Sequence, residues 1–115
     1  MALERHIQTA AVDRHRVTRA VERTASRGKW TVRWESDHRA KLARGSSAAN
    51  AVFGALSPYQ ELMIRFIVQR DSIVGLVVVE LGRSAIGGVI GVARARRRFH
   101  RFVDDLTAEL VRPRS

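Results

Sequence analysis

Five arginines crowd into one short stretch near the end of the sequence, and their chemistry is the clearest in the chain. They are Arg94, Arg96, Arg97, Arg98 and Arg101. Guanidinium is a planar, permanently charged fork of N–H donors that matches the geometry of phosphate. Each phosphate that such a cluster neutralises releases counterions, which gives affinity without sequence preference. The stretch therefore favours binding to nucleic acid, and a solvated face or a protein interface is the plain alternative.

A second group of arginines, nearer the start of the chain, follows the spacing of one helical face. Its members are Arg16, Arg19, Arg23 and Arg27. Residues three and four apart stack along a helix, so these side chains would project to one side. A solvated outer face explains the pattern as well as a phosphate contact does. We include Arg16, Arg19 and Arg23 among the candidate nucleic-acid-binding residues.

The segment 29–35, KWTVRWE, alternates large apolar and polar residues and is typical of a short strand. Its two tryptophans, Trp30 and Trp34, are candidates for stacking on nucleic-acid bases, although such residues more often belong to a core. The W-x-V-R-W motif is followed by a polar turn and an Ala-rich stretch. This combination is similar to the N-terminal arm-binding domains of phage-type tyrosine integrases.

That resemblance implies a small DNA-binding module with a three-stranded sheet and a helix. It covers less than a quarter of the 115 residues. The further strands of that family are not evident after Asp37, and no residue role is carried over from it.

The length of 115 residues predicts a single domain. Charged residues are distributed unevenly along it. Residues 1–53 are basic with a net charge of +6, the Gly-rich apolar centre 54–93 is neutral, and residues 94–115 carry +4. This pattern favours an anionic partner or a membrane-flanking segment. Of the 21 basic residues 19 are arginine, a bias that a GC-rich genome would also produce.

Motifs for catalysis and for cofactors fail when they are examined residue by residue. Residues 82–89 have the G-x4-G spacing of a phosphate-binding loop, but Gly88 and Val89 stand where lysine and Ser/Thr should follow. The chain has no cysteine, and its four histidines show no ligand spacing. Asp104 and Asp105 would point about 100° apart on a helix, so the two carboxylates would not share one site as a catalytic pair does. We therefore expect no enzyme, no cofactor and no metal site.

The elements that must position these residues are predicted to be mainly α-helical. Apolar spacing predicts an amphipathic helix over 3–27 that Gly28 terminates, and a broken helix over 36–56. Ser57-Pro58-Tyr59-Gln60 has the form of a capping box and predicts a helix from Pro58 to about Leu81. A last helix over 85–111 would complete a C-terminal helical hairpin that turns near residues 82–88.

Residues 73–81, IVGLVVVEL, also allow a different fold class. The run is rich in β-branched residues and lies between Asp71 and Gly82, as expected of a fully buried strand. The alternative fold is therefore α+β with 73–81 as a strand, because periodicity does not decide between the two.

The same region could instead form one marginal membrane span over residues 72–93. Gly87 and Gly91 would then be helix-packing positions in an oligomer, with the following arginines as an anchor. Glu80 and Arg83 near its middle oppose insertion, since each costs roughly 2.5–3.5 kcal/mol on insertion scales. A helical subunit of a protein assembly is a third possibility.

The sequence thus predicts a small basic, non-enzymatic protein that binds DNA or RNA through phosphates and can form a homo-oligomer. A phage, mobile-element or chromatin-associated component would have these properties. The first thirty residues carry charges and no apolar segment of a secretory signal, so we expect an intracellular protein, cytoplasmic or associated with a virion or nucleoid. Membrane localisation is the alternative.

Overall fold

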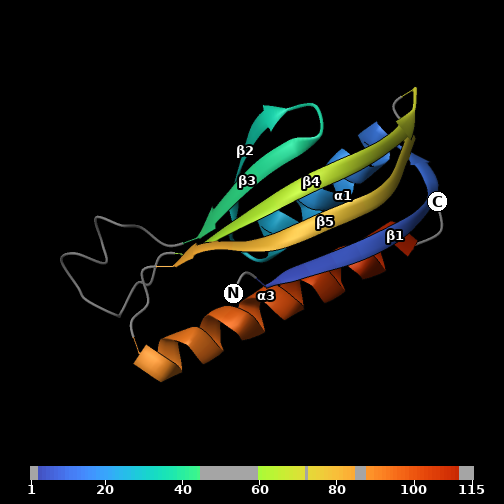
Figure 1. Ribbon diagram of the computed structural model, residues 1–115. Helices are drawn as coiled ribbons and strands as arrows, with labels where there is room; N and C mark the ends of the chain where they lie inside the picture. Colours follow the sequence, from blue (N-terminus) through green and yellow to red (C-terminus); the bar gives the residue numbers. More distant parts are fainter. Residues whose placement is uncertain (1–2, 45–59, 72, 85–87, 112–115) are drawn as a thin grey trace.

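The described part of the chain folds as an antiparallel sheet with two helices, an α+β architecture. The computed structural model describes residues 3–44, 60–71, 73–84 and 88–111 (Figure 1). Along the chain the elements are β1 (Glu4–Asp13), α1 (Arg14–Arg27), β2 (Thr31–Ser36), β3 (Arg39–Arg44), β4 (Gln60–Arg70), β5 (Ile73–Ser84) and α3 (Gly88–Val111). The strands form one five-stranded sheet in the order β1-β5-β4-β3-β2.

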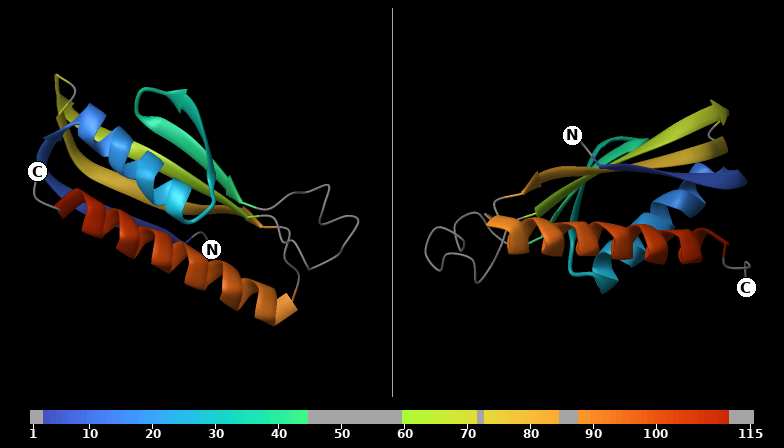
Figure 2. Two further views of the ribbon diagram at one scale, coloured as in Figure 1. Left: turned by 180° about the vertical axis from the view of Figure 1, so that it is seen from behind. Right: turned by 60° about the horizontal axis from the view of Figure 1, so that its bottom comes forward.

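Both helices cover the same face of this sheet, so the core lies between one layer of strands and one layer of helices (Figure 2). Paired residues on the covered face are buried together, as Leu42 is with Leu62 and Ile64 with Val79. The buried apolar side chains of the second half of α3 repeat at three- and four-residue spacing. They are Phe99, Phe102, Val103, Leu106 and Leu110.

The prediction of a mainly α fold is wrong, and the α+β alternative with 73–81 as a buried strand is correct. β5 lies inside the sheet, with β1 on one side and β4 on the other. Its successive residues Val77, Val78 and Val79 are all buried. A run that is apolar on both faces has no period-two signature, so it also satisfies helical spacing.

The predicted helix from Pro58 to Leu81, and with it the helical hairpin, is wrong from Gln60 onward. Residues 60–70 form β4, which pairs antiparallel with β5. Asp71 follows with φ 45°, the left-handed conformation that short hairpin turns require. The capping residues at 57–59 lie outside the described residues.

The predicted helix over 3–27 is wrong in its first half and confirmed in its second. Residues 4–13 are β1, because the buried strand β5 needs hydrogen-bonding partners on both sides. α1 begins at Arg14, where the carboxylate of Asp13 accepts a hydrogen bond from the backbone N–H of His15 at 2.7 Å. The local cap, rather than the apolar spacing, marks the start of the helix.

The short strand predicted at 29–35 is confirmed as β2. The broken helix predicted for 36–56 is wrong as far as Arg44, since residues 39–44 form β3; the remainder lies outside the described residues. The predicted final helix over 85–111 is confirmed as α3 from Gly88 onward.

The membrane span predicted for 72–93 is not what these residues form. The described part of that segment is β5 followed by the start of α3. Within the described ranges, no helix combines the length and the apolar character needed to cross a bilayer.

α1 ends in a tight turn that leads directly into β2. Trp30 N–H donates to Ala25 C=O at 2.8 Å and Lys29 N–H to Ser26 C=O at 3.2 Å, the pattern of a Schellman motif. Gly28 lies against the indole of Trp30, so closely that a Cβ at this position would be 2.7 Å from Cδ1 of the ring. The sequence therefore needs glycine here because Trp30 folds back over the end of the helix.

We expect Gly28→Ala to lower the free energy of unfolding by about 1–3 kcal/mol, because the buried indole would have to shift. Urea unfolding measures this change. Gly75→Ala is the matched control, since the three atoms nearest its new Cβ all belong to the flexible side chain of exposed Gln69. Equal losses in the two variants would contradict the assigned role of Gly28.

Candidate anion-binding pocket

A pocket of about 570 Å³ lies where the end of α1, the end of β3 and the middle of α3 meet. Its size falls within the range of small-molecule sites, about 300–1,000 Å³. The pocket is lined by Thr24, Arg27, Gly28, Lys29, Trp30, Arg44, Arg98, Arg101, Phe102 and Asp105.

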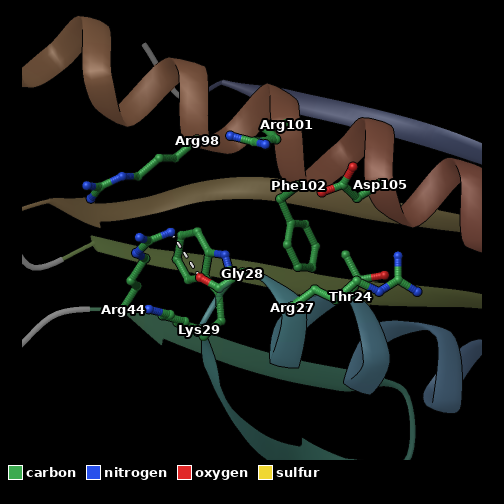
Figure 3. A pocket seen from close by; sticks show the side chains of 10 residues that line it. Thr24, Arg27, Gly28, Lys29, Arg44, Arg98, Arg101, Phe102 and Asp105 are labelled. Carbon is green, nitrogen blue, oxygen red and sulfur yellow. Dashed lines mark hydrogen bonds between the residues drawn. The ribbon is translucent and has the colours of Figure 1, made fainter.

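Cations dominate this lining. Five of the lining residues are basic, and Asp105 is the one acid among them. Figure 3 shows Arg98 and Arg101 on the side of α3 and Lys29 and Arg44 on the opposite side. The fold thus collects positive charge from parts of the chain far apart in sequence, and an anion in this pocket would face it from two sides.

The positive charge at the centre of the pocket is not neutralised by neighbouring acids. Burial lowers the pKa of the half-buried Arg98, and the like charges of Arg44 and Arg94 lower it further. Across the described ranges, no ion pair joins a carboxylate to Arg44, Arg98 or Arg101. Like charges held together repel, so an anion bound between them would lower the free energy of the folded state.

The floor of the pocket is apolar, since it consists of two buried aromatic side chains. Trp30 and Phe102 are buried and meet edge to face, with ring centroids 5.9 Å apart. Figure 3 shows Phe102 projecting from α3 between the two groups of cations. One Nη atom of Arg44 also donates to the carbonyl of Gly28 at 2.9 Å, which holds this side chain over the turn. The site pairs a fixed aromatic base with a cationic rim.

Lys29 occupies a strained backbone position on this rim. Its φ is 61°, in the left-handed region, and it stands where a Schellman motif usually has glycine. A side chain there costs roughly 1–2 kcal/mol. Strained residues of this kind cluster at functional sites.

The predicted α3 arginines divide into two groups. Arg98 and Arg101 line the pocket. Arg94, Arg96 and Arg97 are exposed on the same helix and do not line it. Arg94 and Arg97 share a face with Arg101 by their three- and four-residue spacing, and so extend the positive surface beyond the pocket.

The predicted α1 arginines act mostly within the protein. Arg23 and Arg27 form ion pairs with the buried carboxylate of Glu109 on α3, the first of them at 3.6 Å. One Nη atom of Arg16 donates to the carbonyl of Leu110 at 3.4 Å. These contacts join α1 to the end of α3. Arg19 is exposed on α1.

The tryptophans predicted to stack on bases differ in their surroundings. Trp30 lines the pocket, whereas half-buried Trp34 donates from Nε1 to Glu22 at 3.3 Å and packs edge to face on Phe66. Of the predicted helix-packing glycines, Gly91 lies in α3 and Gly87 lies outside the described residues.

Sequence reasoning missed Lys29 and Arg44 and assigned Arg27 only to a helical face. The sequence Gly28-Lys29-Trp30 could have predicted this part of the pocket, because a glycine at the end of a helix indicates a turn and the next two residues are a cation and an aromatic ring. Arg44 was missed because its segment was expected to be helical, whereas its place depends on the pairing of β3 with β2, which sets Ala43 opposite Thr31.

No protein-family model and no curated protein matches the chain.

We expect Lys29→Gly to raise the free energy of unfolding by about 1 kcal/mol, since glycine adopts left-handed conformations readily. The same variant should bind anions more weakly, because the rim loses a charge. Urea unfolding and phosphate titration by calorimetry measure the two effects. A more stable variant that binds phosphate as tightly as the unaltered protein would contradict the role of Lys29 in the pocket.

Proposed function

We propose that the protein binds nucleic acid through its phosphates and catalyses no reaction, with the pocket rim and the adjoining face of α3 as the contact surface. The observation that carries this proposal is the convergence of five basic residues with a single acid around one pocket; Arg27 pairs with Glu109, and the other four form no ion pair with a carboxylate of the described residues. Guanidinium groups match phosphate in geometry and keep their charge at any physiological pH. The net charge of +10 would attract any polyanion toward this surface.

A polymer explains the exposed arginines better than a small anion does. Arg94 and Arg97 lie outside the pocket on the face that contains Arg101, so a ligand confined to the pocket would leave both unused. A phosphate backbone could cross the pocket rim and continue along this helix. Such a partner also accords with an intracellular protein associated with a nucleoid or a virion.

We expect affinity for DNA and RNA to fall steeply with salt, because each phosphate contact releases counterions. Arg94→Ala combined with Arg97→Ala should reduce the slope of log K against log salt by up to about 2, since each contact contributes about 0.9. Fluorescence anisotropy of labelled oligonucleotides across a salt series gives the slope.

The matched control is Arg39→Ala combined with Arg70→Ala, which removes two exposed arginines from the sheet. This control should leave the slope near that of the unaltered protein. Equal effects of the two double variants would contradict the proposed surface. Absence of binding to any nucleic acid at low salt would overturn the proposed function.

A further inference from the structure

We propose that the pocket takes one unpaired nucleotide, its phosphate held by Arg44, Arg98 and Arg101 and its base lying against Trp30 and Phe102. This proposal rests on the proposed function and deepens it, because it makes single-stranded nucleic acid the preferred partner. It follows from the juxtaposition of a cationic rim and an aromatic floor within one pocket.

The charges define where the phosphate belongs. Arg44 comes from β3 and Arg98 from α3, and the two approach closely enough for each charge to act on the other (Figure 3). A phosphate between them, whether the monoanionic diester of a strand or the more highly charged monoester of a free nucleotide, replaces repulsion with two charge-assisted contacts. Arg101, one turn further along α3, can reach the same group from the side.

The aromatic floor defines where the base belongs. Trp30 and Phe102 are the two aromatic residues in the lining of a pocket whose volume is about 570 Å³, and both are buried. Every base has an apolar π-surface that associates with aromatic side chains whatever its sequence. A floor made of two rings therefore suits a base better than a sugar or a phosphate.

Geometry then excludes a paired base. A base within a duplex is stacked and hydrogen-bonded, and it can lie against Trp30 and Phe102, which are buried in the fold, only after it is unpaired. A single strand pays no such cost. The pocket should consequently distinguish single strands from duplexes, while the exposed arginines of α3 bind both.

The nucleotide in the pocket can be a free nucleoside monophosphate or one unit of a single strand. The experiment separates these with adenosine monophosphate, a short oligoadenylate and a duplex of the same length.

The chain offers a direct optical probe, since it has two tryptophans and only Trp30 lines the pocket. In a Trp34→Phe background, Trp30 is the sole tryptophan. We expect oligoadenylate and adenosine monophosphate to quench its emission and the duplex to leave it unchanged. Tighter binding of oligoadenylate would identify the strand as the ligand, and equal binding would identify the free nucleotide.

Arg98→Ala in this background should weaken quenching by oligoadenylate about tenfold or more, the effect of losing a charge-assisted hydrogen bond. Arg96→Ala is the matched control: it removes the same charge from the same helix at a position that does not line the pocket. We expect its effect to stay within about twofold. Lys29→Gly adds a test in a variant that is expected to be more stable.

Three results would overturn the proposal. They are unchanged Trp30 emission while anisotropy shows that oligoadenylate binds, equal quenching by duplex and single strand, and equal weakening by Arg98→Ala and Arg96→Ala. Each of these leaves the proposed function intact, because the polymer still binds. Quenching by adenosine monophosphate without binding of any polymer would instead overturn the proposed function and support the pocket.

Discussion

The contact between Trp30 and Phe102 is the interaction on which the candidate site depends. It joins the turn after α1 to the middle of α3, two segments far apart in sequence, and it forms the floor of the pocket. Gly28 permits it by leaving room for the indole, and the apolar residues of α3 that follow Phe102 hold the helix against the sheet. Once this contact is made, Arg98 and Arg101 lie opposite Lys29 and Arg44. The position of the charges is thus a consequence of apolar packing.

Electrostatics alone would not produce this arrangement, because like charges separate when they are free to do so. Asp105 is the one acid in the pocket lining, and two buried acids pair with cations in other contacts: Glu109 with Arg23 and Arg27, and Glu61 with Lys41 at 3.3 Å. These pairs stabilise the contact between α1 and α3 and the pairing of β3 with β4, while the pocket keeps its excess of positive charge. Two residues of the pocket are in unfavourable local environments: Lys29 has a left-handed backbone conformation that is rare for residues other than glycine, and Arg98 is partly buried beside like charges. Such conflicts are expected at functional sites.

The sequence predicted the helices α1 and α3 better than most of the strands. Amphipathic spacing located α3 and, in the second half of the helix predicted over 3–27, α1, because each exposes one face to water. It failed at β4 and β5, whose residues are apolar without a clear period, since a strand buried in the middle of a sheet reads like a buried helix. The arginine-rich stretch of α3 was recognisable, and Arg98 and Arg101 do line the pocket. Arg44 was not predicted as part of it, because residues 36–56 were expected to be helical, whereas the pairing of β3 with β2 sets Ala43 opposite Thr31 and so places Arg44 beside Trp30.

The central claim is that Arg44 and Arg98 act together on one anionic group. Nitrogen-15 NMR of the arginine Nε–H groups during titration with adenosine monophosphate tests it most directly. The account predicts that the signals of Arg44 and Arg98 shift together with one dissociation constant, while those of Arg39 and Arg70 on the sheet stay in place. Shifts spread evenly over all arginines, or different dissociation constants for Arg44 and Arg98, would contradict it.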